Sequence, residues 1–195
     1  MDAREQTSLL DDEVQQAVSQ SRFQNLSPQT ALAKPELISW KRKVATFQLA
    51  AKTGPIMEQA SLFETTIDPA ETIDPFTLPQ QNTEFWRWQV SDVGVAALYF
   101  VIDYQSNLLL YVGETVKSNQ RWKGEHDCKR YLMNYRHAHY HHDLDSQLGI
   151  AFWRHAPSER RPRQKVESSL IYKWRSPFNK ENWKFWGTPF IGEGG

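Results

Sequence analysis

The stretch VAALYFVIDYQSNLLLYVGET, residues 95–115, determines the fold that we expect. Two runs of apolar, aromatic and branched residues, 95–103 and 108–115, flank the short polar segment 104–107. Such runs around a polar turn predict a β-hairpin. Because neither run alternates with polar residues, both faces of the hairpin should be buried.

Three further segments follow the hairpin. Residues 117–142 are polar, with a stripe at helical spacing formed by Arg121, Glu125, Cys128, Leu132 and Tyr135. The segment QLGIAFWRHA, residues 147–156, predicts a third strand. Arg161-Pro162 then opens a helix that Ser176-Pro177 closes. The predicted order is β-β-α-β-α, an α/β fold with a small three-stranded antiparallel or mixed sheet flanked by helices.

Residues 1–82 differ in character, and we expect them to be an extension of a domain spanning 83–195. The first thirty residues are rich in Gln, Ser, Asp and Glu, which predicts a mobile tail. Pro35 and apolar residues at helical spacing predict an amphipathic helix over about 35–52. The proline-rich segment 56–82, where Thr66-Ile67-Asp68-Pro69 is echoed by Thr72-Ile73-Asp74-Pro75, predicts a linker.

The charges are unevenly distributed although the net charge is zero. Residues 1–90 carry 8 basic and 12 acidic side chains, whereas 117–184 carry 15 basic and 7 acidic side chains and all 6 histidines. A basic half of this kind is typical of phosphate-binding domains. The single cysteine, Cys128, excludes an internal disulfide and a cysteine-based zinc cage. Since no apolar run approaches the length of a membrane span, we expect a soluble, cytoplasmic protein.

Short motifs on the hairpin resemble those of a known family. Ala97-Leu98-Tyr99 and Tyr111-Val112-Gly113 resemble the paired tripeptides that name the GIY-YIG nuclease superfamily. Ala and Leu replace Gly and Ile in the first tripeptide, and Val replaces Ile in the second, which Glu114-Thr115 follows as in the family. Further matches are the arginine and histidine of the family's first helix, its metal-binding glutamate and a later asparagine, at Arg121, His126, Glu167 and Asn179, with Asn182 as a second candidate.

The resemblance, over roughly residues 95–182, implies a metal-dependent endonuclease that hydrolyses DNA phosphodiester bonds in repair, recombination or replication. It implies one Mg²⁺ or Mn²⁺ ion held by Glu167. Water would be activated near Tyr99 and Tyr111, and phosphate oxygens stabilised or protonated by Arg121 and His126. The implied substrate-binding residues are Gly113, Thr115, Lys123 and Asn179. Two alternatives are a non-catalytic nucleic-acid-binding module with the same fold and a restriction-type endonuclease.

The residues themselves support part of this interpretation. Glu167 lies on the same helical stripe as Leu170 and Trp174, so its carboxylate should face inward and need a metal or a cation. Pairing with Arg161 or Arg163 is the alternative. Tyr99 and Tyr111 would lie directly opposite each other if the loop were the five residues 103–107. The alternative for both tyrosines is packing within the hairpin.

His126 and the four histidines after it need a separate interpretation. Arg121 and His126 would point about 140° apart on one continuous helix, so the helix is expected to begin after Gly124, with Arg121 in the preceding loop. The cluster His137, His139, His141 and His142 has no acidic or cysteine partner in the nearby sequence that would indicate zinc. We expect it to be a solvated or phosphate-facing helix end.

The predicted linker carries a possible docking peptide. Gln59-Ala60-Ser61-Leu62-Phe63 resembles the short motif by which bacterial replication and repair proteins bind the β sliding clamp. Gln59 and Ser61 would be polar contacts, and Leu62 and Phe63 apolar anchors. The alternative is that Leu62 and Phe63 pack against the chain's own domain.

Overall fold

The computed structural model describes residues 32–54, 58–60, 65–82, 95–116 and 127–190. The chain divides into two units, 1–31 and 32–195, and every described residue lies in the second unit. The predicted mobile tail therefore lies outside the described residues. So do Arg121, Lys123 and His126, together with Ser61, Leu62 and Phe63 of the proposed docking peptide.

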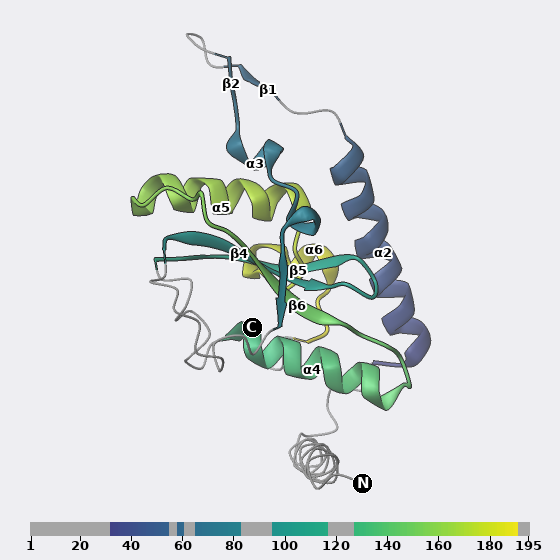
Figure 1. The fold of residues 1–195 in the computed structure, drawn as a ribbon. Helices are drawn as coiled ribbons and strands as arrows, with labels where there is room; N and C mark the ends of the chain where they lie inside the picture. The colour runs from purple at the N-terminus through teal and green to yellow at the C-terminus, as the bar shows by residue number, and fades with distance from the viewer. Residues whose placement is uncertain (1–31, 55–57, 61–64, 83–94, 117–126, 191–195) are drawn as a thin grey trace, which may run out of the picture. The chain divides into compact units, whose positions relative to one another are not determined.

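The described part of unit 32–195 is an α/β fold built around a four-stranded antiparallel sheet (Figure 1). Its strand order is β3-β6-β4-β5, and a separate hairpin pairs β1 with β2. The elements are α2 (Lys34–Thr53), β1 (Glu58–Ala60), β2 (Thr65–Ile67), α3 (Pro69–Thr72), η2 (Pro75–Thr77), β3 (Gln80–Asn82), β4 (Ala97–Asp103), β5 (Leu108–Thr115), α4 (Asp127–His141), β6 (Leu148–Trp153), α5 (Arg160–Trp174), η4 (Lys180–Asn182) and α6 (Trp183–Trp186).

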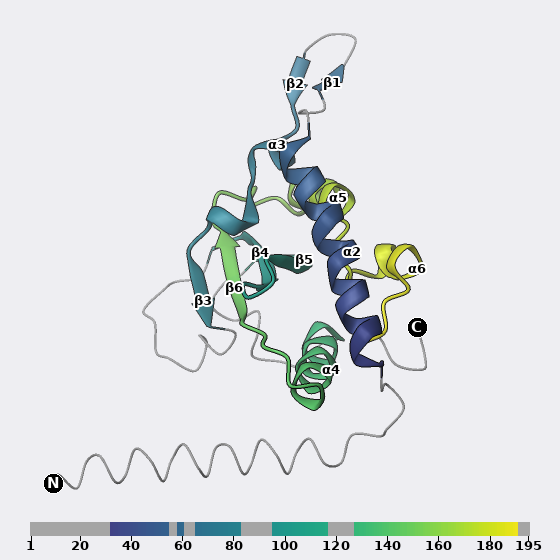
Figure 2. The ribbon, with the colours of Figure 1, turned by 90° about the vertical axis from the view of Figure 1, so that its right-hand side faces the viewer.

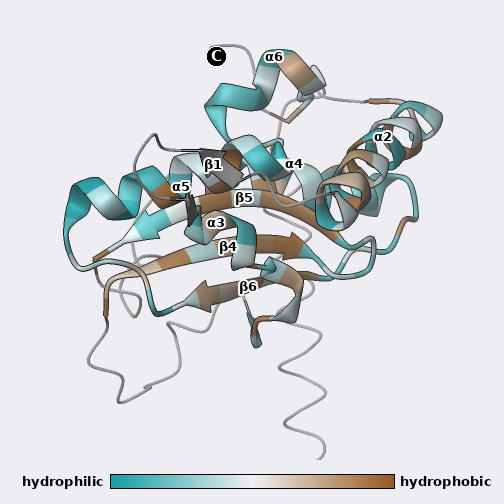
Figure 3. Cartoon of the chain, turned by 90° about the horizontal axis from the view of Figure 1, so that it is seen from above, coloured by the Kyte–Doolittle hydropathy of each residue, from teal (hydrophilic) through white to brown (hydrophobic). Residues whose placement is uncertain are grey.

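Both faces of the sheet are covered, as the composition of the hairpin predicted. Every residue of β4 is buried, because alternate side chains enter two different clusters. Tyr99 and Val101 pack with α4 and the first part of α2 on one face. Leu98 and Phe100 pack with α5 and α3 on the other face (Figure 2). Figure 3 shows the resulting contrast between the apolar strands and the hydrophilic outer surface of α5.

The sheet has four strands, one more than the three that the sequence predicted. Gln80, Gln81 and Asn82 form β3, which pairs antiparallel with Ala151, Ile150 and Gly149 of β6. This strand lies at the edge of the sheet and joins β6 by backbone pairing, which does not require apolar side chains. The sequence signal for a strand is apolar, and β3 has none.

The expected boundary between residues 82 and 83 does not match the division of the chain. The predicted helix is confirmed as α2, but Leu37, Trp40 and Val44 belong to the same core as the sheet. Gln48 fixes α2 to the edge of the sheet. Its side-chain amide donates to Leu109 O (2.8 Å) and accepts from Leu109 N (2.9 Å), so it pairs with β5 as a further strand would. α2 is therefore part of the fold and not of an extension.

The segment predicted as a linker contains ordered helical turns. Asp68 accepts from Ala70 N (2.9 Å) and caps α3, which begins at Pro69. Asp74 accepts from Phe76 N (3.0 Å) and caps η2, which begins at Pro75. The repeated Asp-Pro pairs are therefore N-caps followed by a proline in the first turn, a standard helix start. No helix among the described residues is long and apolar enough to cross a membrane.

Candidate active site

The two tyrosines of the hairpin lie on one face but are not a direct cross-strand pair. Tyr99 pairs with Gly113, and Tyr111 pairs with Val101. The turn is four residues long, 104–107, and a bulge between Val101 and Ile102 shifts the register by one. An even turn alone would put the tyrosines on opposite faces, and the bulge returns them to the same face. Their ring centroids are 5.8 Å apart with planes tilted by 31°.

Gly113 makes room for the Tyr99 ring. A Cβ atom at Gly113 would lie 2.3 Å from Tyr99 Cζ, which no side chain can tolerate. The Tyr99 side chain is fully buried, whereas Tyr111 is partly exposed. The Tyr99 ring therefore fills the space over Gly113, and the water-activating and substrate-binding roles expected of these two residues stay predictions. Thr115, also expected to bind substrate, is 7% exposed.

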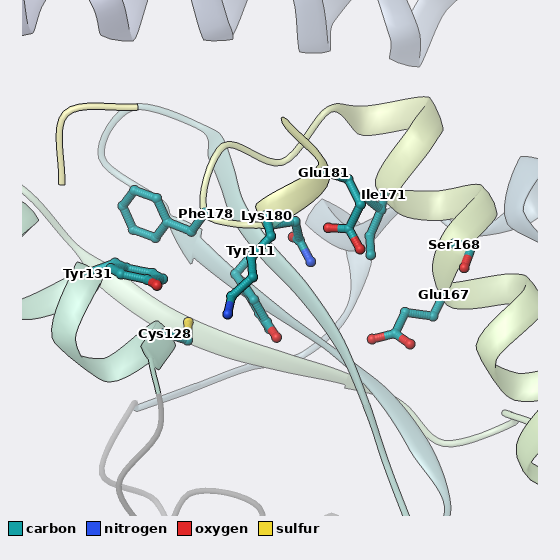
Figure 4. A pocket seen from close by; sticks show the side chains of 10 residues that line it. Tyr111, Cys128, Tyr131, Glu167, Ser168, Ile171, Phe178, Lys180 and Glu181 are labelled. Atoms are coloured by element: carbon teal, nitrogen blue, oxygen red, sulfur yellow. The ribbon is translucent and has the colours of Figure 1, made fainter. Parts of the chain in front are cut away.

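A pocket of about 340 Å³ lies between β5, α4, α5 and the segment after α5. Tyr111 and Glu167 both line it, and in Figure 4 the phenol oxygen and the carboxylate point toward each other across it. The other lining residues are Cys128, Tyr131, Ser168, Ile171, Phe178, Asn179, Lys180 and Glu181. Two residues that lie far apart in the sequence therefore line one pocket.

α5 is fixed to the hairpin one turn before Glu167. Arg163, 1% exposed, forms an ion pair through Nε with Glu114 Oε2. Its guanidinium also donates to the carbonyl oxygens of Pro157 (2.9 Å) and Ser158 (2.7 Å). Residues four apart share one helix face, so this anchor orients Glu167 toward the edge of β5. The alternative that Arg163 neutralises Glu167 does not fit, because Glu114 is the ion-pair partner of Arg163.

Asn179 closes the exposed edge of β5. Its amide accepts from Val112 N (3.0 Å) and donates to Val112 O (2.9 Å), and Ser176 Oγ donates to its oxygen (2.6 Å). Asn182 is fully buried and donates to Ile171 O in the last turn of α5 and to Ser176 O after the end of the helix. Of the two candidates for the family asparagine, Asn179 is the one that lines the pocket. Its amide holds the strand that carries Tyr111, which gives Asn179 a positioning role, and the expected substrate contact stays a prediction.

One of the four clustered histidines, His139, does not fit the solvated helix end that we expected. His139 is 1% exposed. Its Nδ1 lies 2.8 Å from Tyr135 O and its Nε2 lies 2.8 Å from Lys41 Nζ. Because Lys41 can only donate, the ring donates through Nδ1 and accepts through Nε2. His142 Nε2 contacts Leu32 O at 2.6 Å; His137 and His142 are half-buried, and His141 is exposed.

His139 belongs to a buried polar network centred on Asp103. The Asp103 carboxylate is fully buried and accepts from Tyr135 Oη (2.7 Å), Gln147 N (3.0 Å) and Lys41 Nζ (3.3 Å). Burial alone would raise the pKa of Asp103, but the hydrogen bonds from Tyr135 and Gln147 and the charge of Lys41 lower it. Burial lowers the pKa of His139. The network joins α2 and α4 to the turn of the hairpin.

Sequence reasoning missed Lys180 and Glu181, which follow Asn179 and line the pocket. Both are exposed, and their only signal was position next to the matched asparagine. The described residues contain no group of three or more His, Cys, Asp or Glu side chains that could hold a metal. Two carboxylates, of Glu167 and Glu181, do border the same pocket, and Mg²⁺ is commonly bound by one or two carboxylates with water and substrate phosphate. The donor chemistry of the pocket therefore fits a divalent cation.

Comparison with known proteins adds no family assignment, because no family model, curated protein or solved structure matches the chain.

Proposed function

We propose that the chain is a metal-dependent endonuclease of the GIY-YIG type that hydrolyses DNA phosphodiester bonds. The observation that carries the proposal is that Tyr111 and Glu167 line one pocket and face each other across it. The two residues come from β5 and α5, on motifs that the sequence matched independently. Tyr99 would have a positioning role. Its buried ring lies beside the Tyr111 ring and limits the movement of the Tyr111 side chain.

In this proposal Tyr111 takes the role that we first expected of Tyr99. Its phenol borders the pocket and can hydrogen-bond the attacking water or a phosphate oxygen. Lys180 supplies a positive charge at the same pocket for the phosphate. Arg121, Lys123 and His126, which lie outside the described residues, are proposed from the resemblance to contribute further cations and a proton donor.

Glu167 would hold the divalent metal, with Glu181 as a second carboxylate at the rim. A bound Mg²⁺ or Mn²⁺ would supply Lewis acidity and stabilise charge on the phosphate. The protein's part is to fix the carboxylate. Arg163 anchors α5, and Asn179 holds β5, so both walls of the pocket are tied to the sheet.

Cleavage of labelled DNA tests the proposal directly. Linear duplex, flap and branched DNAs would be incubated with the protein and Mg²⁺, Mn²⁺ or EDTA. We expect metal-dependent strand cleavage that Glu167→Gln abolishes, because the amide keeps the shape of the side chain but loses the charge that binds metal. Glu159→Gln, at an exposed position before α5, is the matched control and should cleave as the wild type does.

Two results would contradict the proposal. Full metal-dependent activity in Glu167→Gln would remove that residue from the site. DNA binding by the wild type without cleavage of any substrate would instead favour a non-catalytic nucleic-acid-binding module.

A role in replication or repair, with docking on the sliding clamp, stays a prediction. Gln59 lies in β1 and pairs with Thr66 of β2, so the peptide begins within a hairpin and not in an unstructured linker. Ser61, Leu62 and Phe63 lie outside the described residues.

A further inference from the structure

A second hollow, of about 850 Å³, adjoins the pocket that holds Glu167. It lies between the C-terminal half of α2, α3, α5 and α6, which Figure 2 shows around one side of the fold. Ser168 lines both hollows, so they meet along α5. A chain molecule that occupies the Glu167 pocket can therefore continue into the second hollow without leaving the surface of α5.

An aromatic shelf forms the outer part of this hollow, and we define it as Tyr172, Arg175 and Phe185. The Arg175 guanidinium carbon lies 4.4 Å from the centroid of the Tyr172 ring and 5.2 Å from that of Phe185. The two aromatic residues are 67% and 54% exposed. Phe185 is supported from within by Phe47 and Trp186, at centroid distances of 5.7 and 4.7 Å.

The backbone conformation of Arg175 places its guanidinium near the rings of both Tyr172 and Phe185. Arg175 ends α5 in the left-handed conformation (φ 47°, ψ 46°), and its N–H donates to Ile171 O (3.0 Å). A residue in this conformation turns the chain away from the helix axis. The side chain therefore leaves the helix direction and lies over Tyr172, toward α6.

The shelf matches the chemistry of unpaired nucleotides. Exposed aromatic rings stack on any base, and a guanidinium can stack on a base or pair with a phosphate. The two acidic side chains of the hollow do not outnumber its two cations. Glu71 pairs with Lys173 (2.8 Å), Asp68 accepts from Ala70 N at the start of α3, and Arg175 is the second cation. An apolar peptide could cover the rings but would leave the guanidinium without an anion.

We propose that single-stranded DNA leaving the Glu167 pocket stacks its bases on the aromatic shelf. This inference rests on the proposed nuclease function and specifies its substrate. Bases within a duplex are paired and stacked on one another, so their faces are closed to the shelf. The preferred substrate then has an unpaired strand next to the cleaved bond, as in a flap or an overhang.

Binding in EDTA tests the shelf separately from cleavage. Fluorescence anisotropy would compare a labelled thymidine dodecamer with an abasic strand of the same length and charge, on the full chain. We expect the wild type to bind the thymidine strand roughly tenfold more tightly, in line with the stacking of one or two bases. Tyr172→Ala with Phe185→Ala should lose this preference while keeping the affinity for the abasic strand.

Two further variants make the test decisive. Tyr172→Ala alone changes an exposed side chain and should retain the fold, with a smaller loss of preference. Tyr140→Ala is the matched control, because Tyr140 is equally exposed (67%) but lies on α4. Equal binding of the two strands by the wild type, or an unchanged preference in the double variant, would overturn the inference.

The two proposals fail in different ways. Loss of the thymidine preference in the double variant, with no cleavage of any DNA by the wild type, would support the shelf and contradict the nuclease. Metal-dependent cleavage that depends on Glu167 but treats flap and duplex alike, in both wild type and double variant, would support the nuclease and contradict the shelf.

Discussion

The two hairpin tyrosines differ in what they can contact, and this difference is testable. Tyr111→Phe removes a hydroxyl from the pocket, so the single-turnover cleavage rate should fall by roughly 10²-fold. Tyr99→Phe changes a fully buried ring away from the pocket and should lower the rate much less. A larger loss in Tyr99→Phe than in Tyr111→Phe would restore the role that the motif first indicated.

The buried imidazole of His139 should make stability depend on pH. Burial lowers its pKa from 6.5 in the folded state, so the unfolded chain takes up a proton first as the pH falls. The contribution of the neutral ring is complete above pH 6.5 and is lost as the pH falls toward the folded pKa. Asp103, whose pKa is lowered from 3.8, acts in the same direction at lower pH.

Urea unfolding at pH 7 and pH 5 measures this effect. The free energy of unfolding should fall toward pH 5, with a slope of at most about 1.4 kcal/mol per pH unit from this group. His139→Gln should show a weaker pH dependence, whereas His155→Gln, at an exposed position, should keep that of the wild type. An equal slope in His139→Gln and the wild type would contradict the prediction.

Motifs identified some site residues but did not determine what each residue does. Glu167 was found from its helical stripe and the match, and it does border the pocket with Tyr111. The roles expected of Tyr99, Gly113 and Asn179 depended on register and on hydrogen bonds to the backbone. A bulge in β5 sets that register, and a bulge leaves no compositional signal in an apolar strand.

At the scale of elements, the edge of β5 is paired with two side-chain amides, those of Gln48 and Asn179. The Gln48 amide can be tested by substitution. Gln48→Leu would keep much of the side-chain volume but leave Leu109 N–H and C=O without their partner, as well as Trp174 O. Buried backbone groups that lose a partner cost about 1–3 kcal/mol each. We expect a loss of about 2–4 kcal/mol in the free energy of unfolding, measured by urea denaturation.

Gln105→Leu is the matched control for this variant. Gln105 lies in the exposed turn of the hairpin, and it donates to Asp103 Oδ1 through its backbone N–H, which the substitution retains. Its free energy of unfolding should stay within about 0.5 kcal/mol of the wild type. A similar small change in Gln48→Leu would show that the amide is not needed at the β5 edge.

The elements that were predicted share one property, namely a strong apolar pattern. α2, β4, β5, β6 and α5 all carry one, and each appears close to its expected bounds. β3 is polar and joins the sheet through its backbone, so nothing in its side chains marks it. The Asp-Pro pairs before α3 and η2 did carry a signal, but turns and helix starts use the same residues. Whether an Asp-Pro pair forms a turn or starts a helix depends on how the following residues pack against the sheet.

At the scale of the molecule, the two possible N-terminal truncations should have different effects on folding. Removing residues 1–82 would delete α2 and β3, and with them Leu37, Trp40 and Val44 of the core. Exposing the sheet in this way should prevent stable folding. Removing residues 1–31 follows the division of the chain and leaves the described core complete.

A protein lacking residues 1–31 should therefore unfold at the same urea concentration as the full chain. Its DNA affinity should also fall with salt at the same slope, because that slope reports the number of phosphates neutralised by basic side chains. Residues 117–184 carry 15 of the 23 basic side chains, and residues 1–31 carry only Arg4 and Arg22. Anisotropy titrations between 50 and 200 mM salt, a range of about fourfold, would measure both slopes. A clearly shallower slope in the truncated protein would assign DNA contacts to the N-terminal residues despite their acidic character.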